Sequence, residues 1–149
     1  MDRWKELKGR ISDKINDWYA AHIAKIVPVP DTDFLYRRIS PEWRQPDGTI
    51  SSAAFDNFQM STDLASLTTP YKSWKRARNK DFGLARLPVQ NLRTLRVPQE
   101  VKHWPAILNY SHTLVSGEKK AQGKMKKKIA QTASIIIDTS KYRTAPPQR

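Results

Sequence analysis

Residues 107–137, which read ILNYSHTLVSGEKKAQGKMKKKIAQTASIII, join an apolar stretch to a lysine-rich one through Ser116 and Gly117. The apolar part, 107–115, is rich in β-branched and aromatic side chains, which is typical of a buried or half-buried strand. In the second part, Met125 and Ile129 belong to an apolar stripe at a spacing of four, which predicts a helix over 118–133. We therefore expect a strand that packs in the core, followed by a helix that carries the densest positive charge in the chain.

The rest of the chain adds short elements around this unit. Thr69 and Pro70 are typical of the start of a helix, as N-cap and first helical residue. Residues 98–105, bounded by two prolines, are expected to form a loop, and 50–60 remains undecided between a short helix and a strand. Ser61, Thr62 and Asp63 are interpreted as a cap or turn. The sequence thus predicts an α+β domain over 28–137. Its small sheet has a few strands (34–39, 82–87 and 107–115), and two or three helices (including 70–79 and 118–133) accompany it.

The first 27 residues predict a long amphipathic helix. Apolar or aromatic side chains recur at intervals of three or four residues over 3–26, on one face of a helix that Pro28 and Pro30 end. The opposite face mixes acidic and basic residues, which disfavours a membrane-surface helix. Two interpretations stay open: the helix packs on its own domain, or it docks a protein partner or a second copy. The side chains expected to make that contact are Trp4, Leu7, Ile11, Ile15 and Trp18.

Composition narrows the classes of partner. The chain has 149 residues, a formal net charge of +13 and no cysteine, and the excess charge lies almost entirely in 71–149. Such a chain attracts nucleic acid, anionic lipid or an acidic protein. The absence of cysteine excludes disulfides and thiolate metal sites, and we expect neither a metal nor a cofactor. No apolar run approaches the ~20 residues of a membrane span, and no signal peptide is evident, so we expect a cytoplasmic protein with an extended tail at 138–149.

Two basic clusters are the candidate nucleic-acid contacts, because lysine and arginine neutralise phosphates. In the first cluster Tyr71 or Trp74 could also stack on a base, although the helical spacing favours Trp74 in the core. The second cluster resembles a phosphate-binding P-loop, but its glycines are one residue too far apart and Met125 stands where Ser or Thr would hold magnesium. The candidate residues are Lys72, Lys75, Arg76, Arg78 and Lys80, and Lys119, Lys120, Lys124, Lys127 and Lys128.

A catalytic interpretation depends on His112, which lies in an alternating strand pattern and would face a cleft. Tyr36, Arg37 and Ser52 are candidates for positioning a substrate beside it, in an RNA-cleaving or nucleotide-transferring site. Metal-independent RNA cleavage requires an acid and a base, and one histidine supplies at most one of them. We therefore favour a role without catalysis.

Several short motifs resemble those of a group of small uncharacterised bacterial proteins. They are the run 35–41 (LYRRISP), Pro46-Asp47-Gly48, the Ser-rich segment 51–55, 60–63 (MSTD), and 112–115 before Gly117 and a lysine-rich helix. The resemblance covers roughly residues 34–137 and implies one compact bacterial domain without an assigned activity. From the charge, the two basic clusters and this resemblance, we expect a basic nucleic-acid-associated accessory protein of a bacterial assembly. A small enzyme of toxin or defence type and a basic adaptor for an acidic protein are the alternatives.

Overall fold

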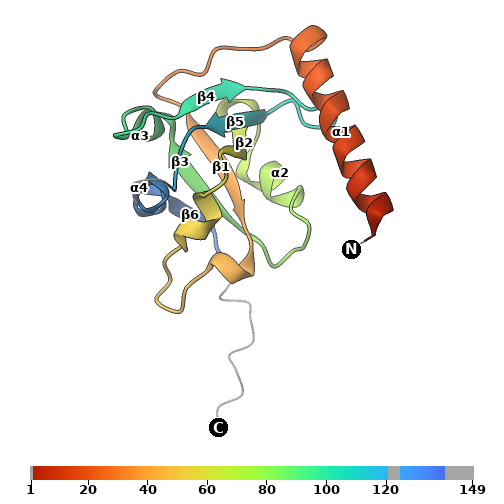
Figure 1. Ribbon diagram of the computed structural model, residues 1–149. Helices are drawn as coiled ribbons and strands as arrows, with labels where there is room; N and C mark the ends of the chain where they lie inside the picture. Colours follow the sequence, from red (N-terminus) through yellow and green to blue (C-terminus); the bar gives the residue numbers. More distant parts are fainter. Residues whose placement is uncertain (1, 121–124, 140–149) are drawn as a thin grey trace.

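The fold is an antiparallel sheet of six strands with helices on both faces and a long N-terminal helix at one side, as the computed structural model of residues 2–120 and 125–139 shows (Figure 1). The strand order is β4-β5-β2-β1-β3-β6. The predicted α+β class is confirmed, and the sheet is larger than predicted. The strands are β1 (Phe34–Ile39), β2 (Gln59–Leu64), β3 (Gly83–Pro88), β4 (Glu100–His103), β5 (His112–Ser116) and β6 (Ser134–Ile137), and the helices are α1 (Arg3–His22), α2 (Pro70–Lys75), α3 (Val89–Arg93) and α4 (Met125–Thr132).

One face of the sheet carries the hydrophobic core. Leu35 of β1 pairs with Leu64 of β2 and Leu87 of β3, and all three side chains are fully buried. Ile129 of α4 and Phe55 of the short helix η2 (Ser52–Phe55) cover this face. Because successive strand residues point to opposite sides, this alternation leaves Tyr36, Arg38 and Asp63 on the other face.

That second face is polar, and α2 packs on part of it. Thr69 caps α2 by accepting a hydrogen bond from the Lys72 backbone N–H, and Pro70 opens the first turn, as the sequence predicts. Buried Ser73 points from α2 toward Asp63 of β2. Since Ile129 lies in the core and Ser73 on the polar face, α2 and α4 are on opposite sides of the sheet (Figure 1).

Asp2 caps the start of α1, because its carboxylate accepts a hydrogen bond from the Trp4 N–H. The helix ends at His22, four residues before the predicted end at 26. Its second half rests on the chain after β4: Asp17 accepts a hydrogen bond from the Trp104 indole, and Asn16 accepts one from the Ile107 N–H. The linker after α1 returns to the body, where the Val27 N–H donates to Nδ1 of buried His103.

The structure corrects the predicted secondary structure in several places. Residues 59–64 and 100–103 are strands rather than a turn and a loop, because both find partners in β5. Only 112–116 of the predicted strand 107–115 is extended, since the preceding residues turn to meet α1. Residues 118–120 of the predicted helix are not helical, and the described part of α4 is Met125–Thr132. Residues 134–137 form a strand along β3. Residues 140–149 of the predicted tail lie outside the described residues. Among the residues that are described, no helix is long and apolar enough to cross a membrane.

Candidate nucleic-acid interface

The basic residues Lys72, Lys75, Arg76, Arg78 and Lys80, which we call the α2 cluster, are all exposed. Helix α2 ends at Lys75, so Arg78 and Lys80 lie on the following turns rather than on the predicted helix 70–79. The segment 69–80 contains no acidic residue. Five exposed cationic side chains therefore share one stretch of surface that holds no carboxylate of its own.

Two aromatic side chains accompany these cations. Tyr71 is 57% exposed, and its ring lies 6.0 Å from the partly buried ring of Trp74. The Trp74 indole N–H donates to the Phe82 carbonyl at 2.7 Å, which fixes the ring. Tyr71, Trp74, Lys75 and Lys80 line a pocket of about 350 Å³ together with Ala77 and Asn79. Trp74 is thus half-buried, and the aromatic pair borders the pocket, with the Lys75 ammonium 4.9 Å from the centre of the Tyr71 ring.

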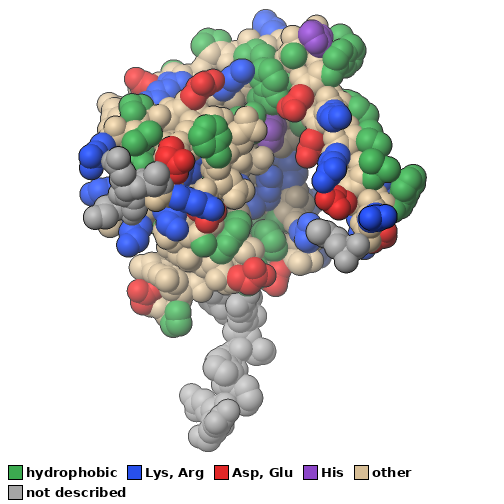
Figure 2. All heavy atoms as spheres, in the orientation of Figure 1, with side chains coloured by type: hydrophobic (Ala, Val, Ile, Leu, Met, Phe, Trp, Pro, Cys, Tyr) green, Lys and Arg blue, Asp and Glu red, His purple; other side chains and the backbone are tan. Residues whose placement is uncertain are grey.

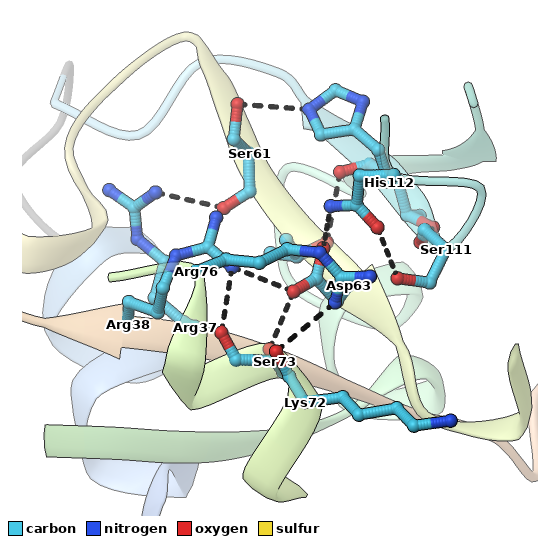
Figure 3. A network of polar contacts seen from close by, with 12 residues as sticks. Arg37, Arg38, Ser61, Asp63, Lys72, Ser73, Arg76, Ser111 and His112 are labelled. Carbon is cyan, nitrogen blue, oxygen red and sulfur yellow. Dashed lines mark hydrogen bonds and ion pairs between the residues drawn. The ribbon is translucent and has the colours of Figure 1, made fainter. Parts of the chain in front are cut away.

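Asp63 ties α2 to the sheet through a buried network (Figure 3). One carboxylate oxygen accepts hydrogen bonds from Arg38 Nη1 at 2.7 Å and from Ser73 Oγ at 2.5 Å. The other accepts from the Asn109 amide at 2.7 Å. Arg38 neutralises this carboxylate inside the protein, so the negative charge of Asp63 does not offset the positive charge of the α2 cluster.

His112 lies on the same polar face, next to Ser61. Nδ1 is 2.7 Å from the Trp104 carbonyl, which can only accept, so Nδ1 carries the proton in the neutral ring. Nε2 then has the free lone pair and lies 3.2 Å from Ser61 Oγ. The result is a hydroxyl next to an imidazole in the tautomer that a general base requires.

The structure brings only part of the predicted catalytic set together. Tyr36 and His112 are register partners of Asp63 on either side, which places them about 10 Å apart on one face. Arg37 faces the core side, where its guanidinium donates to the carbonyls of Ala54 and Ser61, and burial lowers its pKa to about 10. The Arg37 guanidinium is therefore engaged with backbone carbonyls, one of them that of Ser61, and its role beside His112 stays a prediction.

Ser52 is also separate from His112. It lies on η2, in a pocket of about 620 Å³ that also includes Lys127 and Gln131 of α4. Ser61 and Asp63, in contrast, belong to the polar face and were missed. Exposed and buried positions alternate at first in 59–64, but Thr62 and Asp63 are polar although buried, so the sequence shows no apolar period there.

The second basic cluster differs from its prediction as well. Lys119 is 1% exposed, and its Nζ donates to the carbonyls of Phe58, Val115 and Gly117 at 2.9–3.2 Å. It is a structural residue and not a phosphate contact. Lys127 and Lys128 are exposed on α4, and Lys120 is exposed in the segment before it, 4.0 Å from Asp56. Lys124 lies outside the described residues. Because α2 and α4 lie on opposite faces, the two clusters do not form one continuous phosphate track.

The predicted docking side chains of α1 are exposed. Trp4, Leu7, Ile11, Ile15 and Trp18 are each between 47% and 60% exposed. Figure 2 shows hydrophobic side chains along the outer side of α1, and charged side chains facing a hollow between α1 and the body. Trp18, Asp17 and Ala21 line one wall of a groove of about 670 Å³, whose floor includes Lys102 and Leu114.

Neither a metal site nor a relative adds to this picture. Within residues 2–120 and 125–139, no group of three or more His, Asp or Glu side chains could hold a metal ion. In comparisons with known proteins, no protein-family model, no curated protein and no solved structure matches the chain.

Proposed function

We propose that this protein binds single-stranded nucleic acid through the α2 cluster, as an accessory component of a bacterial, cytoplasmic assembly. The observation that carries the proposal is the pairing of five exposed cations with an exposed tyrosine at the edge of a pocket. Cations attract the phosphates of any nucleic acid. The aromatic face adds a contact that only an unpaired base can make.

The geometry supports a single strand over a duplex. Helix α2 has six residues, and Ser73 fastens it to the sheet, so it does not stand free to enter a major groove. A flexible strand, however, can place one base against Tyr71 and its neighbouring phosphates near Lys75 and Lys80. The pocket of about 350 Å³ beside these residues is large enough for one base.

A salt series tests the proposal with two variants that remove equal charge. One replaces Lys75, Arg76 and Lys80 by alanine, and the matched control replaces Lys120, Lys127 and Lys128. Fluorescence anisotropy measures the affinity for a labelled single-stranded oligonucleotide of mixed sequence. We expect the first variant to bind about 30-fold more weakly and to lower the salt slope by about 2, since each phosphate contact contributes ~0.7 to that slope.

The control variant should lose less than threefold. Equal losses in both variants would show that net charge alone attracts the oligonucleotide, and an affinity independent of salt would overturn the proposal. If an acidic polypeptide such as polyglutamate binds more tightly than the oligonucleotide, the protein is instead an adaptor for an acidic protein.

The pairing of Ser61 with His112 favours one second candidate function, a nucleotide-transferring or RNA-cleaving enzyme. His112 Nε2 would take the proton of the Ser61 hydroxyl as that oxygen forms a bond to a phosphorus atom of the nucleotide or RNA. The P–O bond to the leaving oxygen would break at the same time, and the imidazolium would return its proton to that oxygen. Incubation with labelled RNA or nucleotide tests it: Ser61→Ala and His112→Ala should both abolish turnover or labelling while leaving oligonucleotide affinity unchanged. Activity that persists in both variants would exclude this site.

A further inference from the structure

The outer side of α1 is an apolar stripe that the body does not cover. Ala20, the buried residue of α1, lies about 180° around the helix from Ile11, as 3.6 residues per turn require. Asn16 and Asp17 accept the hydrogen bonds that join α1 to the described body. The stripe therefore points away from the side that holds α1 in place, and of its residues Trp18 also borders the groove between α1 and the body.

The spacing along this stripe is regular. Trp4, Leu7, Ile11, Ile15, Trp18 and His22 follow one another at intervals of three, four, four, three and four. That is an 11-residue repeat, which at ~3.67 residues per turn keeps a stripe straight along a helix for several turns. Such a stripe matches another helix along its whole length.

The stripe is also symmetric about Ile11. Leu7 and Ile15 lie four residues to either side, and Trp4 and Trp18 lie seven residues to either side. An antiparallel copy with its two-fold axis at Ile11 thus places Trp4 opposite Trp18, Leu7 opposite Ile15, and Ile11 opposite itself. This self-complementarity is what an isologous dimer interface requires.

We propose that α1 pairs with α1 of a second copy of this chain, antiparallel, with Ile11 on the two-fold axis. The exposed parts of the five apolar side chains amount to about 500 Å² per copy, so that pairing buries about 1,000 Å² before flanking residues are counted, near the lower limit of stable interfaces. Antiparallel helix dipoles attract one another. The body meets only the second half of α1, so the two bodies stand at opposite ends of the helix pair and on its outer sides.

The mass in solution is the first test, and it does not depend on nucleic-acid binding. Sedimentation equilibrium at micromolar concentration should give twice the chain mass of 17.2 kDa. Ile11→Glu places two buried like charges at the axis and should weaken association at least 100-fold. Ser12→Glu, the neighbouring position off the stripe, is the matched control and should leave the dimer intact. A monomer at this concentration would overturn the proposal.

Cysteine cross-linking tests the direction, because the chain has no cysteine of its own. Under mild oxidation Ile11→Cys should link to itself, and Leu7→Cys should link to Ile15→Cys in a mixture. Leu7→Cys alone should not link, since two antiparallel copies of position 7 are about 12 Å apart along the axis, which exceeds disulfide reach. Self-linking of Leu7→Cys would show a parallel pair. A dimer in which Ile11→Cys does not link would use another surface.

Discussion

The α2 cluster and the lysine-rich segment 119–128 are each tied to the sheet by one buried charged side chain. For α2 that side chain is Asp63, an acid on β2 that holds Ser73 and is itself paired with Arg38. For the second segment it is Lys119, one of the segment's own cations, which donates to three backbone carbonyls.

The difference decides how much charge each segment presents. The α2 cluster keeps all five of its cations exposed, because the charged side chain that anchors it, Asp63, belongs to β2 and not to the cluster. The second segment loses one lysine to the interior and has no exposed aromatic among its described residues. The two segments therefore differ although their charge is similar in the sequence. The α2 cluster presents all of its cations at the surface, whereas the segment 119–128 uses one of its lysines to hold the fold together.

Replacement of Asp63 by alanine should have the largest effect. The change leaves Arg38 unpaired and removes acceptors from Ser73 and Asn109. We expect the free energy of unfolding to fall by about 3–5 kcal/mol, the usual cost of breaking a buried ion pair from one side. Urea denaturation measures it. Asp56→Ala, whose 4.0 Å contact with Lys120 is more exposed, should cost less than about 1 kcal/mol. Similar losses in both variants would contradict the role of Asp63 as the anchor.

Lys119→Ala should destabilise the protein by about 3 kcal/mol, because it leaves buried carbonyls without their donor and opens a cavity. Lys120→Ala, the neighbouring exposed lysine, should change the unfolding free energy by less than about 0.5 kcal/mol. An equal, small effect at both positions would show that Lys119 is dispensable.

The same residue gives a pH dependence with a defined sign. Burial lowers the pKa of Lys119 to about 8, below its ordinary value of 10.5. Between these values the unfolded chain binds more protons at this lysine than the folded chain, so this residue makes stability rise with pH across the window. The difference in unfolding free energy between the wild type and Lys119→Ala should therefore increase from pH 8 to pH 10. A constant or shrinking difference would contradict the lowered pKa.

Tyr71→Ala should have the smallest of these effects, and should act on binding alone. A base stacked on an aromatic ring contributes ~1–3 kcal/mol, so we expect about a tenfold loss of oligonucleotide affinity with an unchanged salt slope. Tyr71→Phe keeps the ring and should bind like the wild type. Equal loss in both variants would mean that the hydroxyl rather than the ring makes the contact.

Periodicity alone was sufficient for α1, β1 and β3, because their apolar residues follow one helical or extended pattern. Periodicity was not sufficient for β2, because its Thr62 and Asp63 are polar but buried. The Thr62 hydroxyl donates to the Thr113 carbonyl, and the Asp63 carboxylate accepts from the Asn109 amide. Strand β4 has four residues between prolines, too few to show a period.

Surface position was easier to predict for the α2 cluster than for Lys119. Thr69 and Pro70 fix the start of α2 locally, so its cations follow from the sequence nearby. The fate of Lys119 depends on Phe58, which is distant in the sequence and reaches Lys119 only through the pairing of β2 with β5. The link between Ser61 and His112 depends on the same long-range register.

The strand order also sets when the chain can fold during synthesis. The outer partner of β2 is β5, and the outer partner of β3 is β6. Asp63 therefore cannot pair with His112, nor Ala85 with Ile135, until these later residues have been synthesised. Until 112–116 has left the ribosome, β2 presents an open edge. Until 129–137 has left it, the apolar face lacks Ile129 and β3 presents an open edge. The nascent chain therefore exposes each of these edges from the time its strand is made until the later partner strand has emerged, and an unpaired edge of this kind is prone to aggregation.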